Sequence, residues 1–209
     1  CGAKPFFVDI IEDDYLIDVN KIEEAINKKT KAIIPVNLYG QCADYDKILT
    51  IAKKNKLLVI EDCAQSVGSF YKSKPSGSFG HMSAFSFYPT KNLGAYGDGG
   101  FIGTSIKKYA DRATELRKYG MRKFYYSEEH GINSRLDEVQ AAIIYLKLKK
   151  LKKLIKALDA NLEASIQYPQ HRIHWQFHEN HKKLLLVHLI GQLQHMHKQS
   201  SYCFQYAYE

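Results

Sequence analysis

The chain has 209 residues, 45% of them hydrophobic, and it carries a formal net charge of +8. This length is enough for one sizeable hydrophobic core, or for one domain with an appendage. No apolar run approaches the roughly 20 residues of a membrane-spanning helix, and the first residues lack the pattern of a signal peptide. We therefore expect a cytoplasmic protein with no membrane segment.

The first half of the chain alternates between strand and helix patterns. Strands are predicted at residues 4–9, 32–36 and 57–61, and helices at 18–28 and from Asp44 to Asn55. The run at 57–60 is continuously apolar, which is typical of a parallel strand buried on both faces. This alternation predicts right-handed crossovers and a parallel sheet covered by helices.

The second half is richer in glycine and aromatic residues. Strands are predicted at residues 82–87 and 101–104, and helices at 106–119 and from Glu138 onward. The sequence Gly97-Asp-Gly-Gly100 lacks the GxGxxG spacing and leads into a strand, which disfavours a dinucleotide-binding loop.

The four cysteines are widely spaced and include no CxxC pair: Cys1, Cys42, Cys63 and Cys203. They predict neither a zinc site nor a disulfide framework, so we expect reduced and mostly buried thiols.

Much of the positive charge comes from residues 147–156, which include six lysines. The apolar residues around them alternate at steps of four and three, as on an amphipathic helix: Ile144, Leu148, Leu151, Ile155 and Leu158. We expect the lysines to form the solvated face of this helix, and no nucleic-acid partner. A surface that binds polyanions, with a steep salt dependence, is the alternative.

Chemically useful side chains follow the two central predicted strands. Asp62 and Gln65 come at the end of the strand at 57–61, and Ser86 and Lys91 come at the end of the strand at 82–87. Because the carboxyl ends of parallel strands meet at one edge of a sheet, we expect these side chains to lie close together.

This set of residues suits pyridoxal phosphate (PLP). A lysine amine can form a Schiff base with its aldehyde, and a carboxylate such as Asp62 keeps its pyridine nitrogen protonated. Gln65 could hydrogen-bond the ring oxygen, and Ser86 could hold the phosphate. Each residue taken alone has a structural alternative: a helix cap for Asp62, a strand hydroxyl for Ser86 and a surface charge for Lys91.

Several long motifs resemble the sugar aminotransferases of the DegT/StrS type. They are Glu61-Asp-Cys-Ala-Gln65, Ser86-Phe-Tyr-Pro-Thr-Lys91-Asn-Leu-Gly94, Gly97-Asp-Gly-Gly100 and Gly131-Ile-Asn-Ser-Arg-Leu-Asp137. The resemblance implies an aspartate-aminotransferase-like fold. Residues 1–158 would form an incomplete PLP-transferase large domain of the α/β class, with a mostly parallel sheet flanked by helices.

The same resemblance implies a role for each candidate residue. Lys91 would bind PLP covalently and transfer protons, Asp62 would pair with the pyridinium nitrogen, Gln65 would contact the ring oxygen, and Ser86 would bind the phosphate. Asn133 would reach the phosphate in the site of a partner subunit, which implies a homodimer. The implied substrates are nucleotide-linked keto sugars, with glutamate as the usual amino donor.

The chain also departs from the family pattern. Family members normally have a further N-terminal segment and a small C-terminal domain, so we expect a chain truncated at both ends. Residues 159–209 instead form an atypical tail rich in histidine and glutamine, which we expect to be partly disordered. Its histidines favour a metal site only weakly. The predicted function is a PLP-dependent sugar aminotransferase, and an inactive remnant of such an enzyme is the alternative.

Overall fold

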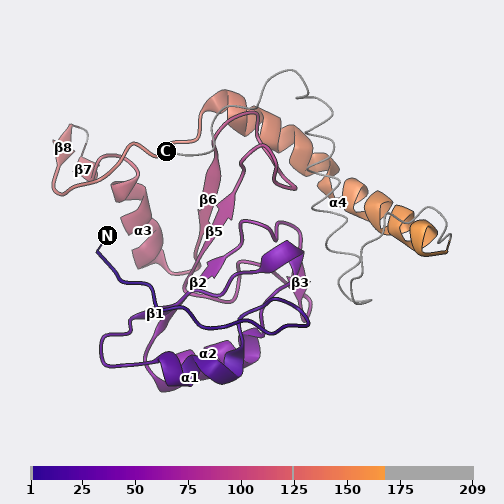
Figure 1. The fold of residues 1–209 in the computed structure, drawn as a ribbon. Coiled ribbons are helices and arrows are strands. Elements are labelled where there is room, and N and C mark those ends of the chain that lie inside the picture. The colour runs from indigo at the N-terminus through magenta and orange to yellow at the C-terminus, as the bar shows by residue number, and fades with distance from the viewer. Residues whose placement is uncertain (1, 124, 168–209) are drawn as a thin grey trace, which may run out of the picture.

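The computed structural model describes residues 2–123 and 125–167. Its centre is a four-stranded sheet with the order β1-β2-β5-β6 (Figure 1). These strands are Ala32–Ile33, Leu58–Asp62, Met82–Ser86 and Gly100–Gly103. The first three are parallel, and β6 is antiparallel to β5. The predicted α/β fold with a mostly parallel sheet is confirmed.

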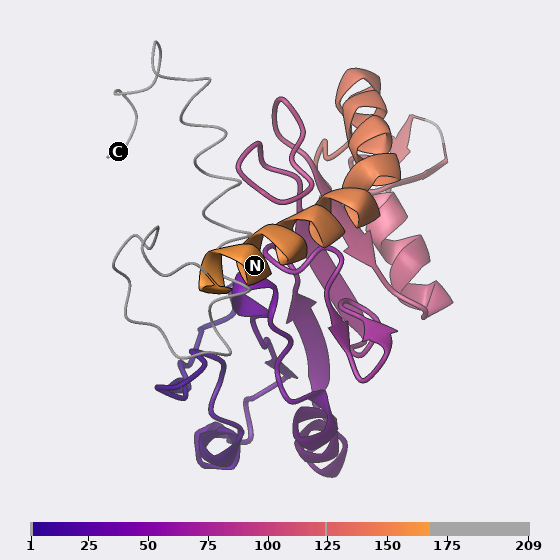
Figure 2. The ribbon, with the colours of Figure 1, turned by 90° about the vertical axis from the view of Figure 1, so that its right-hand side faces the viewer.

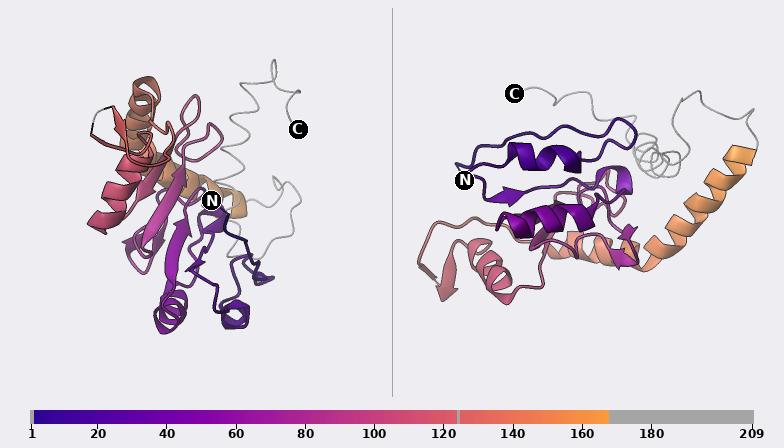
Figure 3. Two further views of the ribbon diagram at one scale, coloured as in Figure 1. Left: turned by 90° about the vertical axis from the view of Figure 1, so that its left-hand side faces the viewer. Right: turned by 90° about the horizontal axis from the view of Figure 1, so that it is seen from below.

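Helices and two small hairpins make up the rest of the described fold. The helices are η1 (Val19–Lys21), α1 (Ile22–Ala25), η2 (Leu38–Gly40), α2 (Tyr45–Lys54), α3 (Lys107–Leu116) and α4 (Glu138–Gln167). The hairpins pair β3 (Phe70–Tyr71) with β4 (Lys74–Pro75), and β7 (Met121–Lys123) with β8 (Tyr126–Ser127). Figures 1 and 2 show α1 and α2 at the same end of the molecule and α3 beside β6, and α4 projects beyond the sheet in Figure 3.

The hydrophobic core lies between α2 and one face of the sheet. Ile33 and Val59 are paired neighbours on β1 and β2, and they pack against Tyr45, Ile48 and Ala52 of α2. Asp44 caps α2 by accepting a hydrogen bond from the Lys47 amide at 3.3 Å, and Asn55 ends the helix, both as predicted.

The N-terminal segment differs from the prediction. Residues 4–9 form no strand, because none of the described residues pairs with them as a neighbouring strand; Phe6 and Phe7 are 73% and 87% exposed. The helix predicted at 18–28 comprises only η1 and α1, since the backbone is already extended at Ile26. The strand at 4–9 and the helix at 18–28 were predicted from their apolar residues alone, which do not show what each segment packs against.

The strand predicted at 32–36 is also shorter, because Pro35 cannot donate a ladder hydrogen bond. Pairing nevertheless continues past it, since the Asp62 amide donates to the Pro35 carbonyl at 2.9 Å and the Asn37 amide donates to the Asp62 carbonyl at 2.9 Å. These bonds keep β1 aligned with the end of β2.

The predicted boundary at residue 158 falls within α4, which continues to Gln167. The rest of the predicted tail, residues 168–209, lies outside the described residues, as do its histidines. The domain division therefore stays a prediction. Among the described helices, none combines the length and apolarity needed to cross a membrane.

Candidate active site

The carboxyl ends of β2 and β5 lie next to each other at one edge of the sheet. Asp62, the last residue of β2, pairs with Ala84, and Ser86 is two residues further along β5. Because side chains alternate along a strand, Asp62 and Ser86 are on the same face of the sheet. The register therefore brings these two predicted site residues together.

Backbone amides hold three of the candidate side chains in place. Asp62 Oδ1 accepts from the Ala64 amide at 3.0 Å, Gln65 Oε1 from the Tyr39 amide at 3.0 Å, and Ser86 Oγ from the Tyr88 amide at 3.2 Å. Each side chain keeps one polar group that has no hydrogen-bond partner within the described residues. These groups are the second carboxylate oxygen of Asp62, the side-chain NH₂ of Gln65 and the hydroxyl hydrogen of Ser86.

Lys91 lies in a tightly closed loop after β5, residues 87–97, which we call the Lys91 loop. The Ala95 amide donates to the Phe87 carbonyl at 2.7 Å, and the Lys91 amide donates to the Tyr88 carbonyl at 2.8 Å. A Cβ on Gly94 would lie 2.5 Å from the Pro89 carbonyl oxygen, so the closure needs glycine at this position. The half-buried Lys91 amine forms no hydrogen bond or ion pair in the part of the chain that the structure describes.

The contacts of Asn133 are with residues outside this group. It is exposed, forms an isolated bridge with Lys118 after α3, and accepts a hydrogen bond from Arg135 Nε at 3.0 Å. Its predicted action in the site of a partner subunit stays a prediction.

Sequence reasoning missed Glu61, the neighbour of Asp62 on β2. Its fully buried carboxylate accepts hydrogen bonds from the amides of Gly77, Phe79 and Gly80 at 2.8, 2.6 and 2.6 Å. These bonds fix the turn that leads into β5. Strand alternation was the available signal, because it places Glu61 on the face opposite Asp62.

Burial keeps the two thiols near this edge protonated and therefore unreactive. Cys42 and Cys63 are free, and burial raises the pKa of Cys42 to about 11 and that of Cys63 above its ordinary value. Both are therefore protonated thiols at neutral pH. Within the described residues, no three His, Cys, Asp or Glu side chains converge as metal ligands.

The polar groups at this edge and in the loops that follow it suit a flat ligand that carries both positive and negative charge. The free Asp62 oxygen can accept a hydrogen bond from a cationic ring N–H, and the Ser86 hydroxyl can donate to an anionic group. The Gln65 NH₂ can donate to a ring oxygen, and the Lys91 amine can attack an aldehyde. These four groups fit the atoms of PLP.

The fold of the chain is similar to that of solved aminotransferases. An aminotransferase from Brucella abortus matches with a TM-score of 0.75 and 38% identity, over 79% of this chain and 47% of that one. S. venezuelae DesV, solved with a ketimine intermediate, matches with a TM-score of 0.74 and 41% identity, over 79% and 45%. The fold thus belongs to this class of enzymes.

The chain belongs to the DegT/DnrJ/EryC1/StrS aminotransferase family, which matches residues 1–171. The predicted resemblance is confirmed.

Curated relatives carry several names. A "Pleiotropic regulatory protein" of Geobacillus stearothermophilus is 51% identical over 150 residues, which are 72% of this chain and 40% of that protein. A dTDP-3-amino-3,4,6-trideoxy-alpha-D-glucose transaminase of Micromonospora megalomicea is 48% identical over 151 residues, with the same coverage of 72% and 40%. A UDP-2-acetamido-2-deoxy-3-oxo-D-glucuronate aminotransferase of Pseudomonas aeruginosa is 48% identical over 148 residues, or 71% and 41%. The chain thus spans about 40% of the length of these relatives.

Proposed function

We propose that this chain supplies the PLP-binding residues of an aminotransferase that transfers an amino group from glutamate to a nucleotide-linked keto sugar. The observation that carries the proposal is the register of β2 and β5, which places Asp62 and Ser86 on one face at the carboxyl edge of the sheet, with Gln65 and Lys91 in the segments that follow these two strands. The names of two relatives, a dTDP-sugar transaminase and a UDP-sugar aminotransferase, support the substrate class.

PLP, when bound, supplies an electron sink that stabilises negative charge on the carbon beside the transferred nitrogen. Lys91 would hold the cofactor covalently through its amine. Once the amino group of the substrate has taken over that bond, the released amine could accept and return the proton that moves between the two carbon atoms on either side of the transferred nitrogen. Asp62 would keep the ring nitrogen protonated through an ion pair with its free oxygen. Without that charge the ring would withdraw electrons poorly.

Two other residues orient the ring. The Gln65 NH₂ would donate to the ring oxygen, and the Ser86 hydroxyl would donate to the phosphate, as neighbouring backbone amides can. Both side chains are already held by backbone amides, so little conformational freedom is lost on binding.

A second copy of the chain forms part of the same proposal. Asn133 is exposed and held by Arg135, so it is available to reach the phosphate in the site of a partner subunit. The working unit would be a homodimer in the cytoplasm.

Absorbance spectroscopy tests this proposal. PLP added to the purified chain should produce the absorbance band of a lysine-bound cofactor, and Lys91→Ala should abolish it while Lys74→Ala, at an exposed lysine of β4, leaves it unchanged. Asp62→Asn should weaken the band. Glutamate should discharge the band and release 2-oxoglutarate. A folded sample without a band would contradict the proposal and favour the inactive alternative.

A further inference from the structure

One face of α4 packs on the Lys91 loop. Ile144 is 8% exposed and lies in a small core with Leu93 and Ala95, which are 3% and 0% exposed. Gln140, one turn earlier on the same face, accepts a hydrogen bond from the Tyr96 amide through Oε1 at 2.8 Å. The first part of the helix therefore contacts the loop through both apolar and polar groups.

Lys147 contacts the same loop from one turn beyond Ile144. Its Nζ donates a hydrogen bond to the Gly94 carbonyl at 2.5 Å and lies 4.8 Å from the centroid of the Tyr96 ring. A charged donor in a half-buried position forms a stronger hydrogen bond than a neutral or solvated one. This bond ends on the glycine whose close contact with Pro89 closes the loop around Lys91.

The prediction that all lysines of this segment lie on the solvated face is wrong for Lys147. Lys149, Lys150, Lys152 and Lys153 are exposed, whereas Lys147 is half-buried. The inward stripe passes through Lys147 and Leu151, and Leu148, which the periodicity placed inward, is 51% exposed. The spacing of the apolar residues by three and four positions allows either Lys147 or Leu148 to face inward. The contact of the helix with the Lys91 loop determines that Lys147 does so.

We propose that Lys147 and Gln140 are positioning residues that hold the Lys91 loop against α4 and so keep Lys91 in one orientation. The role of Lys91 toward PLP rests on the proposed function, but the restraint of the loop does not. Both residues act through the backbone of residues 94–96 and not through contact with the cofactor.

Amide hydrogen exchange of the cofactor-free chain measures the restraint directly. Lys147→Met keeps the length of the side chain but removes the donor, so the Ala95 and Tyr96 amides should exchange about tenfold faster. Lys147→Arg, which restores a charged donor, should return them close to wild type. Gln140→Met should accelerate the Tyr96 amide most, because it removes the acceptor of that amide.

Lys149→Met is the matched control. Lys149 also lies over a tyrosine ring, 4.2 Å from the centroid of Tyr145, but no hydrogen bond to the loop is formed. Exchange in the loop should stay unchanged in this variant. Equal loop exchange in Lys147→Met and Lys149→Met would overturn the proposal, as would a uniform rise of exchange across the whole chain in Lys147→Met.

The rate at which PLP attaches to Lys91, trapped by borohydride at successive times, connects the restraint to the chemistry. Lys147→Met should slow attachment about tenfold and Lys147→Arg should restore it, because a mobile loop spends less time in the reactive orientation. Attachment at the wild-type rate despite faster loop exchange would overturn the orienting role. A wild-type chain that never binds PLP would refute the proposed function and the orienting role, whereas the exchange measurements would still decide whether Lys147 restrains the loop.

Discussion

Glu61 and Asp62 are adjacent carboxylates of β2 with different environments. The carboxylate of Glu61 is fully buried and accepts hydrogen bonds from three backbone amides, whereas Asp62 is half-buried and accepts from one. Glu61 thus belongs to the framework of the sheet edge, and Asp62 keeps an oxygen available for a ligand.

Glu61→Gln tests the framework role. The amide nitrogen of glutamine cannot accept a hydrogen bond, so at least one buried N–H among those of Gly77, Phe79 and Gly80 loses its partner. The free energy of unfolding should fall by about 1–3 kcal/mol, measured by urea denaturation. Glu12→Gln, at an exposed position, should change it by less than about 0.5 kcal/mol. Equal midpoints for the two variants would refute this role.

Asp44 predicts a pH dependence of stability. Burial raises the pKa of Asp44, but hydrogen bonds from the Lys47 amide and the Tyr71 hydroxyl outweigh that effect and hold the pKa below its ordinary value. Because folding lowers this pKa, the ionised Asp44 carboxylate stabilises the folded state at pH values above its ordinary pKa of about 4. This contribution is lost as the pH falls through the lowered pKa.

The comparison with Asp44→Asn isolates this titration, because asparagine still caps the helix but cannot ionise. The stability advantage of the wild type over Asp44→Asn should be constant near neutral pH and should shrink below about pH 4. Urea midpoints at several pH values measure it. An advantage that stays constant into strongly acidic buffer would contradict the assigned pKa direction.

The sequence predicted the positions of residues at strand ends, but it did not predict the roles of residues whose side chains bind the backbone of a loop. Asp62 and Ser86 were predicted to share an edge because parallel strands place their ends together, and the register agrees. Glu61 and Lys147 were missed because their roles depend on loops that the pattern could not place: residues 77–80 for Glu61 and residues 94–96 for Lys147.

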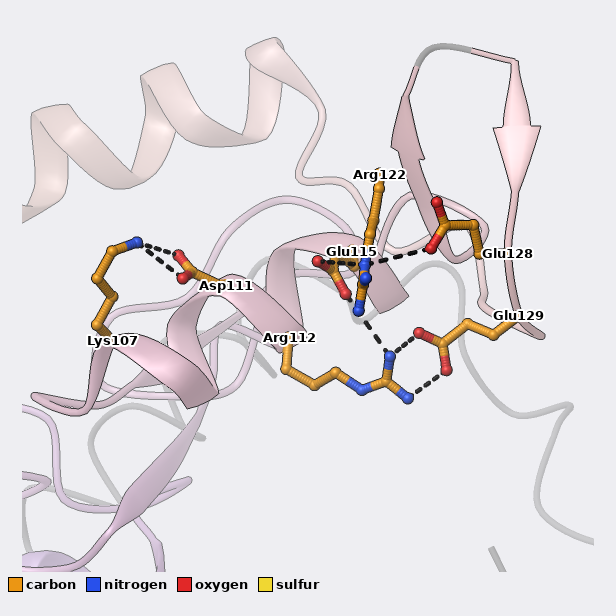
Figure 4. Close-up of polar contacts among 7 residues, drawn as sticks. All are labelled: Lys107, Asp111, Arg112, Glu115, Arg122, Glu128 and Glu129. Carbon is orange, nitrogen blue, oxygen red and sulfur yellow. Dashed lines mark hydrogen bonds and ion pairs between the residues drawn. The ribbon is translucent and has the colours of Figure 1, made fainter.

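At the scale of elements, a charge network joins α3 to the β7–β8 hairpin (Figure 4). Arg112 of α3 forms ion pairs with Glu129, which follows β8, and with Glu115 at 3.6 Å. Arg122 of β7 contacts Glu115 at 3.1 Å and Glu128 at 3.5 Å. The network alternates in sign and spans both elements, so it fixes the hairpin to the helix.

Arg112→Ala should loosen the hairpin without unfolding the molecule. Partly exposed ion pairs contribute little to global stability, so the free energy of unfolding should fall by no more than about 1 kcal/mol. Amide exchange at residues 121–123 and 125–129 should nevertheless rise, because Glu129 loses its ion-pair partner and Glu115 keeps only Arg122. Lys107→Ala removes a pair with Asp111 that lies within α3 alone, and it should leave the hairpin unchanged. If both variants gave the same hairpin exchange, the network would have no restraining role.

Elements with strong caps were predicted well, and elements that depend on distant partners were not. Asp44 and Asn55 bound α2 because caps are local signals. Residues 4–9 have strand-like composition, but no strand in the described part of the chain pairs with them. Periodicity did not fix which residues of α4 face inward.

At the scale of the whole molecule, the two faces of the sheet differ in burial. Ile33 is 7% exposed and belongs to the core with α2, whereas its neighbour Ile34 on the other face is 59% exposed. Leu58 and Ile102, which share the face of Ile34 by their register, are 37% and 56% exposed. The continuous apolar run at 57–60 predicted burial on both faces, but within the described residues only one face is densely covered.

A pair of adjacent substitutions measures this difference. Ile33→Ala should lower the free energy of unfolding by about 2–5 kcal/mol, because it leaves a cavity in the core. Ile34→Ala should lower it by less than about 1 kcal/mol, since much of that side chain is already in contact with water. Urea denaturation of the purified chain checks both values. A cost for Ile34→Ala equal to that for Ile33→Ala would mean that the second face is buried in solution.

We propose that the carboxyl edge of β2 and β5 holds PLP, with Lys91 as its covalent attachment. The most direct test is borohydride reduction of the chain in the presence of PLP, followed by peptide mapping. The pyridoxyl label should lie on the peptide that contains Lys91 and should be absent from that peptide in Lys91→Ala. Labels spread over the exposed lysines of α4, with none at Lys91, would contradict the claim.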